Sequence, residues 1–587
     1  MTVDPSRPSP VARTAPSLAE RAQRVLMTVV LALGAIDTAY FRQWNVNPDG
    51  VSYVDLARAF AAHGPRALVN GYWSPLYPAV LGSAFAIGHP THTGAYPLMR
   101  GIGFVVFALT TFAFARLVRV ALDSPEAPLH RTTRLLAVIA AWELYAVLVL
   151  KGIGLFLVTP DLGVAGIVFW AAAELIHIMR SPVPPLRWIR LGLVLGVGYW
   201  WKAILFPVSG VVLLVAAAIA VRRRDGWRGP LQSWAAFGAL ALLLVIPVSK
   251  HTGRLTFGET GRLNQFWYVA DGGYVVDACQ PPREPARARR TLQLDSVLVA
   301  TPLTCTLTDR WPEATLPMWY DPTIYYRGLQ VPLGVRATVA AAGRNIGYLK
   351  EALEETAPWV TVAFVLAGLV ALGARSAAGR TWPLVVVATA GTGFYLAVYV
   401  ELRHVVPFFV IAGLAVLAAL LSRATPWRRV ALAVLTAGGA VDVAAHASEP
   451  LLIEASILRH EVRGDERPEQ VSTRVARLLA KRGLAEGDHF AAVNTLWNVE
   501  WAQRGGYVVR AYTDEYIVSF TQTFRELRDP CVRAAWERRL AAHSIDAALL
   551  RVPPGFRAPP GFEPLEDTGF HLLRVTHRAP PDGCPAA

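Results

Sequence analysis

Charged residues are scarce in this chain. Only 17% of its 587 residues are Asp, Glu, Lys or Arg, whereas 53% are hydrophobic and the mean hydropathy is +0.36. This composition is too apolar for a soluble globular protein and is typical of a polytopic membrane protein. The formal net charge of +14 is carried almost wholly by arginines, many of them in short segments between apolar runs. Their placement indicates orientation in a membrane, so we expect membrane lipids and no nucleic acid as partners.

Signals of several other protein classes are also missing. The polar stretch 1–24 leads into an apolar run without a small-residue cleavage site, so we expect a retained anchor instead of a cleaved signal peptide. No repeat of solenoid type is apparent. No Cys and His spacing suggests a zinc site, and Arg504-Gly505-Gly506 lacks the spacing of a nucleotide-binding loop.

Apolar runs of spanning length, or close to it, recur along the chain. They lie near residues 25–41, 99–122, 135–151, 162–179, 189–202, 203–221, 231–248, 359–373, 382–400, 405–421 and 430–445. We therefore predict a mainly α, polytopic membrane protein with about eleven transmembrane helices. If the N-terminus is cytoplasmic, every loop predicted to lie inside carries arginine, as the positive-inside rule requires. The odd number of spans then places the C-terminus outside, which is the periplasm for a protein of a bacterial inner membrane.

The four cysteines agree with this topology. Cys279, Cys305, Cys531 and Cys584 all lie in segments that the charge rule places outside. The exterior of a bacterial cell membrane is oxidising, so we expect disulfides. Local pairing would join Cys279 to Cys305 and Cys531 to Cys584, although four cysteines allow three pairings and unpaired thiols are the alternative.

The predicted organisation has three parts: a cytoplasmic tail at 1–24, a transmembrane domain at 25–445 and an extracytoplasmic domain at 446–587. In the extracytoplasmic domain at 446–587, a helix at 472–481 alternates with apolar runs that are typical of strands. This alternation predicts a small α/β domain. Those runs lie at 490–493, 507–511, 547–552 and 571–575.

Two outer loops interrupt the transmembrane domain. The first, at 42–98, contains a mostly apolar stretch at 51–62 and a shorter one at 76–87, which we predict to be helices at the membrane surface. The second, at 249–358, is rich in Gly, Pro, Arg and Tyr, with an aromatic cluster at Trp319-Tyr320-Asp321-Pro322. We interpret it as an ordered lid over a cavity in the membrane domain.

A carboxylate stands directly after the first apolar run, in Asn47-Pro48-Asp49-Gly50. At the outer headgroup layer a carboxylate is costly unless it faces water, a cation or a partner, so Asp49 is a candidate functional residue. The alternative is that Asp49 caps the helix that follows.

Four more short motifs follow Asp49 at the outer ends of predicted spans. They are Gly71-Tyr72-Trp73-Ser74-Pro75-Leu76-Tyr77-Pro78, Thr159-Pro160-Asp161, Gly198-Tyr199-Trp200-Trp201-Lys202-Ala203 and Glu401-Leu402-Arg403-His404-Val405-Val406-Pro407. In this order the landmarks resemble those of the GT-C superfamily of integral membrane glycosyltransferases, in particular the bacterial branch similar to protein O-mannosyltransferases and lipid A aminoarabinose transferases. The third of these motifs departs from the family pattern, with one residue fewer between Gly198 and Lys202.

The resemblance implies a function. Members of that superfamily transfer a sugar from a polyprenyl-phosphate donor to an acceptor on the outer face, with inversion. Asp49 would be the general base on the acceptor, which is a lipid, a glycan or a protein. Lys202 and Arg403 would meet the charge that develops on the leaving phosphate, and His404 would either bind phosphate or fill a helix end.

The resemblance also implies further site residues. Asp161 would act beside Asp49, either by orienting the acceptor or by holding a divalent metal such as Mg or Mn. The metal-using relatives often have an Asp-Glu pair where this chain has Asp49-Gly50, and a Glu-Lys pair where it has Trp73-Ser74. A metal-free site is therefore at least an equal expectation. Other residues expected in the substrate cavity are Tyr72, Trp73, Tyr77, Arg100 and Glu401.

Structural readings of the same residues stay open. Asp161 could be an ordinary acidic helix start, and Lys202 could snorkel to the interface. Arg403 could form a surface pair with Glu401. We expect Asp55 to be an i,i+3 partner of Arg58 and not a second catalytic acid.

Two other functions fit a membrane protein of this kind. A transporter or flippase of lipid-linked glycans typically shows inverted repeats and polar residues near the membrane midplane. A non-catalytic sensor or assembly protein would use the tail as a binding domain and would not need an acid, a lysine and an arginine in one cavity. The polar candidates of this chain stand at outer helix ends, which favours the enzyme.

Overall fold

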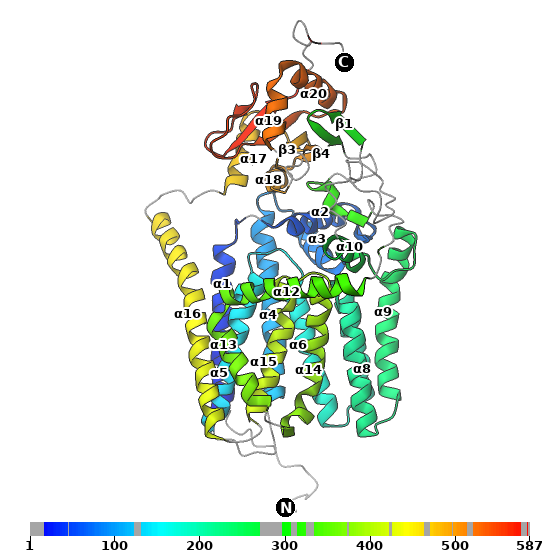
Figure 1. The fold of residues 1–587 in the computed structure, drawn as a ribbon, viewed down its shortest axis with the longest axis vertical. Coiled ribbons are helices and arrows are strands. Elements are labelled where there is room, and N and C mark those ends of the chain that lie inside the picture. Colours follow the sequence, from blue (N-terminus) through cyan, green and yellow to red (C-terminus); the bar gives the residue numbers. More distant parts are fainter. Residues whose placement is uncertain are drawn as a thin grey trace, which may run out of the picture.

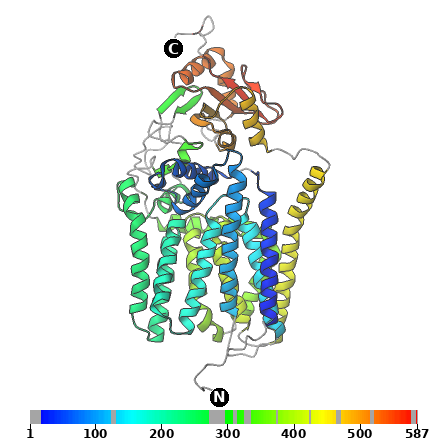
Figure 2. The same cartoon turned by 180° about the vertical axis from the view of Figure 1, so that it is seen from behind.

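The computed structural model describes residues 17–44, 46–122, 131–270, 296–306, 314–323, 331, 334–372, 375–421, 425–462, 470–495, 497–513, 520–576 and 584. A bundle of long helices forms one end of the molecule, and a β-sheet region forms the other (Figures 1 and 2). A layer of short helices lies between them. The fold class is therefore the predicted one: a mainly α, polytopic chain with a small C-terminal region that contains strands.

Each of the eleven predicted apolar runs forms a helix of the bundle. The bundle helices are α1 (Leu18–Tyr40), α4 (Ala95–Leu122), α5 (Arg131–Val147) with its π-helical extension η2 (Leu148–Gly154), α6 (Asp161–Arg180), α7 (Pro185–Trp201), α8 (Leu205–Arg223), α9 (Arg228–Thr252), α13 (Pro358–Leu372), α14 (Arg375–Leu396), α15 (Leu402–Leu421) and α16 (Pro426–Val462). Within the described residues, eight helices are long and apolar enough to cross a membrane, or nine if the bent pair α12–α13 counts as one span. The difference from eleven arises because α7 and α13, with 17 and 15 residues, are short for a membrane span, and the apolar part of α14 covers only Thr381–Leu396.

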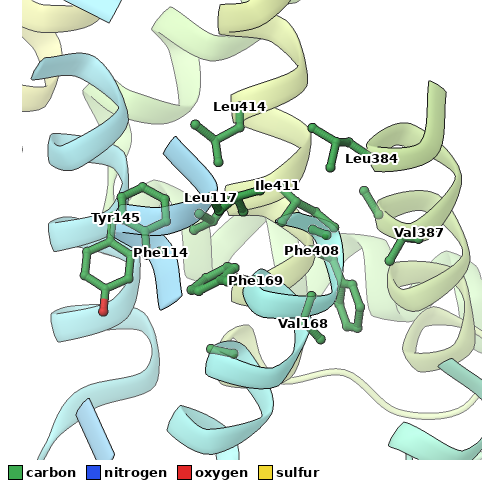
Figure 3. Close-up of a cluster of buried hydrophobic side chains, with 14 of the residues drawn as sticks. Phe114, Leu117, Tyr145, Val168, Phe169, Leu384, Val387, Phe408, Ile411 and Leu414 are labelled. Carbon is green, nitrogen blue, oxygen red and sulfur yellow. The ribbon is translucent and has the colours of Figure 1, made fainter. Parts of the chain in front are cut away.

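Aromatic and branched side chains fill the centre of the bundle (Figure 3). Phe114 of α4 stacks on Tyr145 of α5 with 4.3 Å between ring centroids, and both rings contact Phe169 of α6. The Tyr145 hydroxyl lies 2.8 Å from the Thr111 hydroxyl, so its polar end is satisfied inside the core. Helix α15 runs through this centre, where Phe408 and its neighbours are fully buried.

Close backbone contact holds α7 against α9. A Cβ atom at Gly192 would lie 2.1 Å from the carbonyl oxygen of Ser233, so only glycine allows this approach. The Ser233 hydroxyl donates to the Trp188 carbonyl at 2.6 Å, which ties the same two helices together. Small residues at such contacts are typical of helix packing in membranes.

Arginines gather at the end of the bundle where α1 begins. The Glu174 carboxylate of α6 is fully buried there and pairs with Arg116 at 2.6 Å, Arg190 at 2.8 Å and Arg187 at 3.7 Å. Three cations from two helices, α4 and α7, therefore satisfy one buried acid, so part of the arginine excess also has a packing role.

The intermediate layer contains α2 (Pro48–His63), η1 (Pro65–Leu68), α3 (Leu76–Gly88), α10 (Thr260–Tyr268), α11 (Pro317–Tyr320) and α12 (Val335–Thr356). Helices α2 and α3 match the two predicted surface helices. However, residues 50–57 of α2, including Ser52 and Asp55, are buried inside the protein, so this part of α2 packs against protein on all its faces. Helix α12 was not predicted; it lies across the bundle, bent by 116° from α13 (Figure 1).

The sheet has seven strands in the order β1-β2-β4-β3-β5-β7-β6. Its strands are β1 (Ser296–Ala300), β2 (Leu303–Thr306), β3 (His489–Val493), β4 (Val508–Thr513), β5 (Ala547–Arg551), β6 (Glu563–Pro564) and β7 (Phe570–Arg574), packed with α17 (Val471–Lys481), α18 (Glu500–Gly505), α19 (Phe520–Arg528) and α20 (Pro530–Ala542). The central β3 pairs in parallel with β4 and β5, and the other pairs are antiparallel. All four predicted strands and the predicted helix at 472–481 are present.

Two features of this region differ from the predicted domain boundaries. Strands β1 and β2 come from the long outer loop and extend the C-terminal sheet through the pairing of Cys305 with Tyr512. The boundary expected at 446 lies inside α16, which continues to Val462. The lid loop and the C-terminal region are therefore parts of one sheet.

The disulfide expectations stand as follows. Cys531 and Cys584 are bonded, with Cα atoms 5.3 Å apart, as predicted from local pairing. Cys305 is also disulfide-bonded, while its predicted partner Cys279 lies outside the described residues.

The α7–α9 contact generates a first prediction. Gly192→Ala should lower the free energy of unfolding by about 1–3 kcal/mol, because the new methyl group meets a backbone oxygen that cannot rotate away. Gly238→Ala on α9 is the matched control, since a Cβ there meets no atom within 4 Å. Thermal unfolding of both variants in one detergent measures the effect, and equal midpoints would contradict the proposed contact.

The C-terminal region generates a second prediction, which concerns the pH dependence of stability. Burial raises the pKa of Glu500 to about 7. A carboxyl whose pKa is raised on folding contributes stability below its unfolded pKa of about 4.3, and that stability is lost as the pH rises through the folded pKa. Glu500→Gln should therefore become more stable than the wild type between pH 5 and pH 8, by about 4 kcal/mol at most. Thermal midpoints across this range, with exposed Glu563→Gln as the control, test it; parallel curves would contradict it.

Candidate active site

A cavity of about 230 Å³ lies where the bundle meets the intermediate layer. Its walls come from α2, the segment 72–74, the start of α6, the α7–α8 junction, the segment 257–268, α11 and the α14–α15 junction. Eight of the ten predicted catalytic, phosphate-binding and cavity residues line it: Asp49, Tyr72, Trp73, Asp161, Lys202, Glu401, Arg403 and His404.

Four charged side chains form a continuous chain in the wall of the cavity. Arg403 contacts Asp49 through Nη2 at 3.1 Å and lies 4.0 Å from Asp161 through Nε. Lys202 Nζ donates to the other oxygen of Asp161 at 2.5 Å. Glu401, the most exposed acid of the group, completes the cluster at 2.6 Å from Arg403. The cluster thus has three carboxylates and two cations, held by residues that are far apart in the sequence.

Helix ends bring these groups together. Asp49 lies in the first turn of α2 directly after Pro48, and Asp161 is the first residue of α6 directly after Pro160. Lys202 follows the last residue of α7, and Arg403 lies in the first turn of α15. Each proline marks a helix start, where free backbone N–H groups favour an acidic side chain.

The two structural alternatives for Asp49 and Asp55 do not match the geometry. The N-cap of α2 is Asn47, and the Asp49 carboxylate instead meets Arg403 and the Trp319 indole N–H at 3.1 Å. Asp55 accepts hydrogen bonds from Thr315 and Leu316, whereas Arg58 contacts the His92 ring. The expected Asp55–Arg58 pairing is therefore replaced by a contact with the long outer loop.

His404 is buried beside the charged cluster. Its ring stacks on Tyr395 with 4.8 Å between centroids, and its Nδ1 accepts from the backbone N–H of Glu401 at 3.3 Å. This arrangement fixes the ring at the start of α15 with one nitrogen engaged by the backbone.

Tyr77 and Arg100 lie outside the cavity lining. Tyr77 packs between Tyr53 and Trp201, behind the cavity wall. Arg100 is buried and donates to the carbonyl oxygens of Phe41, Trp44 and Leu155. It fastens α4 to the end of α1 and to the segment after η2, so its position is that of a structural cation.

Several aromatic residues that were not predicted to belong to the site also line the cavity. Trp319 comes from the aromatic cluster in the long outer loop, and Tyr268 of α10 stacks on Tyr399 at 4.0 Å. The Tyr72 hydroxyl donates to Asn264 at 3.1 Å, and burial, followed by the nearby Asp49 carboxylate, raises the pKa of Tyr72. These hydroxyl and indole groups are therefore neutral hydrogen-bonding partners beside a charged wall.

The carboxylates of the cluster are the candidate ligands for a divalent metal. Across the described part of the chain, no group of three His, Cys, Asp or Glu side chains is placed to hold one. Asp49 and Asp161 face each other across the guanidinium of Arg403, and Lys202 takes the second oxygen of Asp161. Asp49 and Asp161 are the carboxylates that would hold such a metal, and each already has a protein cation as its partner.

Comparison with known proteins gave matches among solved structures only. No protein-family model matches the chain, and none of the curated proteins does. The chain is similar to crystal structures of ArnT from Cupriavidus metallidurans, with 12% sequence identity in both cases. The apo structure covers 95% of this chain and 98% of its own with a TM-score of 0.49. The structure bound to undecaprenyl phosphate covers 94% and 98% with a TM-score of 0.40. ArnT is a GT-C aminoarabinose transferase, from the branch that the sequence landmarks resemble.

The charged cluster generates a third prediction. Asp161→Ala should lower the free energy of unfolding by about 3 kcal/mol, because it leaves Lys202 without its buried counter-charge and removes one of the carboxylates near Arg403. Glu401→Ala removes a more exposed partner of Arg403 and should cost about 0–1 kcal/mol. Thermal unfolding of the two purified variants makes the comparison. An equal loss in both would show that Asp161 does not balance the cluster.

Proposed function

We propose that this protein is a glycosyltransferase that moves a sugar from a polyprenyl-phosphate donor to an acceptor on the outer face of a bacterial inner membrane. The observation that carries the proposal is the cavity in which Asp49 meets Arg403, beside Asp161 and Lys202. A carboxylate that can take up a proton lies next to two cations that can bind a phosphate. Transfer with a lipid phosphate as leaving group needs both.

The cations supply the electrostatic part of the reaction. As the bond between the anomeric carbon and the phosphate oxygen breaks, its electron pair moves to the phosphate, and negative charge grows there. Arg403 can donate to two phosphate oxygens, and Lys202 acts as a point charge. The first turns of α6 and α15 also line the cavity, and their backbone N–H groups favour an anion. This set stabilises the leaving group more than the ground state, as catalysis requires.

Asp49 supplies the proton chemistry. It accepts the proton of the acceptor hydroxyl while that oxygen attacks the anomeric carbon from the side opposite the phosphate, which inverts the configuration. A quarter of the Asp49 side chain is exposed, so an acceptor can reach it. The Trp319 N–H and the Arg403 guanidinium hold the carboxylate in place.

The rest of the cavity fits the two ends of such a donor. Ile204 and Pro207 at the start of α8, with Phe394 and Val398 at the end of α14, form an apolar wall on the bundle side that suits a prenyl chain. The aromatic side around Tyr72, Trp73 and Trp319 suits a sugar ring, because rings stack and neutral donors bind hydroxyls.

We infer that this reaction uses no divalent metal, since Arg403 and Lys202 already neutralise the two acids. The transporter alternative has less support, because the cavity and its charges lie at helix ends and not at the middle of the bundle. The acceptor, a lipid, a glycan or a protein, would approach from the side of the C-terminal region.

The decisive test is transfer from a panel of polyprenyl-phosphate-linked sugars by the purified protein. Asp49→Asn should lower kcat by about 10²–10⁴-fold, the usual contribution of a general base. Its Kd for undecaprenyl phosphate should change less than about threefold, whereas Lys202→Met should weaken that binding about tenfold or more by removing a charge-assisted contact. The exposed Asp567→Asn is the matched carboxylate control. Unchanged turnover in Asp49→Asn would remove Asp49 from the mechanism.

A further inference from the structure

A short segment of the long outer loop closes over the catalytic side of the cavity. It comprises residues 314–321 and includes α11. Its Trp319 donates the indole N–H to Asp49 Oδ1 at 3.1 Å. The Trp319 carbonyl accepts from the Trp73 indole at 2.8 Å and from the Ser52 hydroxyl at 3.1 Å. The position of Trp319, and with it one of the two groups that hold the Asp49 carboxylate, therefore depends on this segment.

Asp55 anchors the other end of the segment. Its Oδ2 accepts from the backbone N–H groups of Thr315 at 2.8 Å and Leu316 at 3.2 Å, and its Oδ1 accepts from the Thr315 hydroxyl at 2.9 Å. All three residues are buried. Burial raises the pKa of Asp55, and the hydrogen bonds from Thr315 and Leu316 lower it in part. A buried carboxylate that accepts three hydrogen bonds from one short segment is a strong anchor for it.

The geometry of α2 explains why one helix can both present Asp49 and anchor the segment 314–321 through Asp55. Asp49, Ser52 and Asp55 are three residues apart along α2, so they share one face. All three contact the segment 314–321, at Trp319 and at Thr315 and Leu316. The base and the anchor are thus two turns apart on a rigid element.

The C-terminal region rests on the same residues. Gln503 of α18 donates to the Val51 carbonyl at 3.2 Å and lies 3.4 Å from Asp55 Oδ1, and it accepts from the Tyr96 hydroxyl at 3.0 Å. Trp497 meets the Trp319 ring edge to face, with 5.8 Å between centroids. Contacts from the C-terminal region therefore reach both the anchor and the tryptophan that touches the base.

We propose that Asp55 is a positioning residue that holds the segment 314–321 so that Trp319 orients Asp49, and that this contact couples the C-terminal region to the catalytic base. This proposal rests on the function proposed above. Asp55 does not line the cavity, so it acts through Trp319 and not on a substrate. Its partners are separate from Lys202 and Arg403, so it should affect the chemical step and leave the binding of the lipid phosphate unchanged.

The first experiment separates these two quantities. Asp55→Ala and Trp319→Phe should each lower kcat about tenfold or more, the value of one lost hydrogen bond to a charged group. Their Kd for undecaprenyl phosphate should stay within about threefold of the wild type. Because both changes act through one contact, the double variant should be no slower than the slower single variant. Asp55→Asn keeps one carbonyl acceptor and should recover part of the rate.

Tyr320→Phe is the control, since the Tyr320 hydroxyl makes only a 3.4 Å contact with the Ala67 carbonyl in the same segment. It should keep the wild-type kcat. Losses that multiply in the double variant, or a Kd that rises in step with the fall in kcat, would overturn the positioning role.

The second experiment does not depend on turnover. In the full-length protein, backbone amide exchange at Thr315 and Leu316 should be about tenfold faster in Asp55→Ala and unchanged in Tyr320→Phe. If Asp55→Ala does not fold, the milder Asp55→Asn takes its place with a smaller increase. Unchanged exchange would disprove the anchor even in an active enzyme. Faster exchange in a protein that transfers no sugar would leave the anchor intact and refute the proposed function alone.

Discussion

The site depends on mutual compensation of buried charges. Asp161 is almost fully buried and Arg403 nearly so, and neither would be tolerated alone beside an apolar bundle. Lys202 and Arg403 balance Asp161, and Arg403 in turn balances Asp49. Each charge offsets the desolvation cost of its neighbour. The cluster is therefore stable only when the ends of α2, α6, α7 and α15 meet. The helices of the bundle must therefore pack so that these charges pair, and the charges pair only if the helices pack in this way.

The short helices of the intermediate layer enclose the charged helix ends and so form the cavity. Helix α2 is buried between the bundle and the sheet, where its charged face meets Arg403 on one side and the segment 314–321 on the other. The long outer loop adds β1 and β2 to the C-terminal sheet, so that sheet is attached to the cavity through the chain as well as through Gln503. A change in the C-terminal region therefore has a direct physical route to Asp49.

Much of this arrangement could be predicted from local patterns. Apolar runs marked every bundle helix, and alternating apolar segments marked four strands, because burial in lipid or in a sheet leaves a clear periodicity. Asp49 could be identified because a carboxylate at the headgroup layer needs a partner. Asp161, Lys202, Glu401 and Arg403 were expected only because their motifs resemble those of the GT-C superfamily. Their meeting in one cavity was expected because all of them stand near the ends of predicted helices.

The rest depends on contacts between distant segments, which local patterns do not encode. Arg100 was predicted to be a site residue, but its guanidinium donates hydrogen bonds to three carbonyl oxygens of other segments. Asp55 and Arg58 have the spacing of a helix pair, but backbone N–H groups from residues 315 and 316 compete better for the carboxylate. Trp319 lies 270 residues from Asp49 along the chain, and only its aromatic neighbourhood hinted at a role. Helix α12 was missed because it lies in a region whose composition is that of a loop.

One structure would test the central claim most directly: that of the full-length protein in a lipid nanodisc with undecaprenyl phosphate bound. The account predicts the phosphate in the cavity, within hydrogen-bonding distance of Arg403 and Lys202, with the Asp49 carboxylate facing the open aromatic side. A phosphate bound elsewhere, for example at the arginines around Glu174, with the charged cluster unchanged, would contradict it.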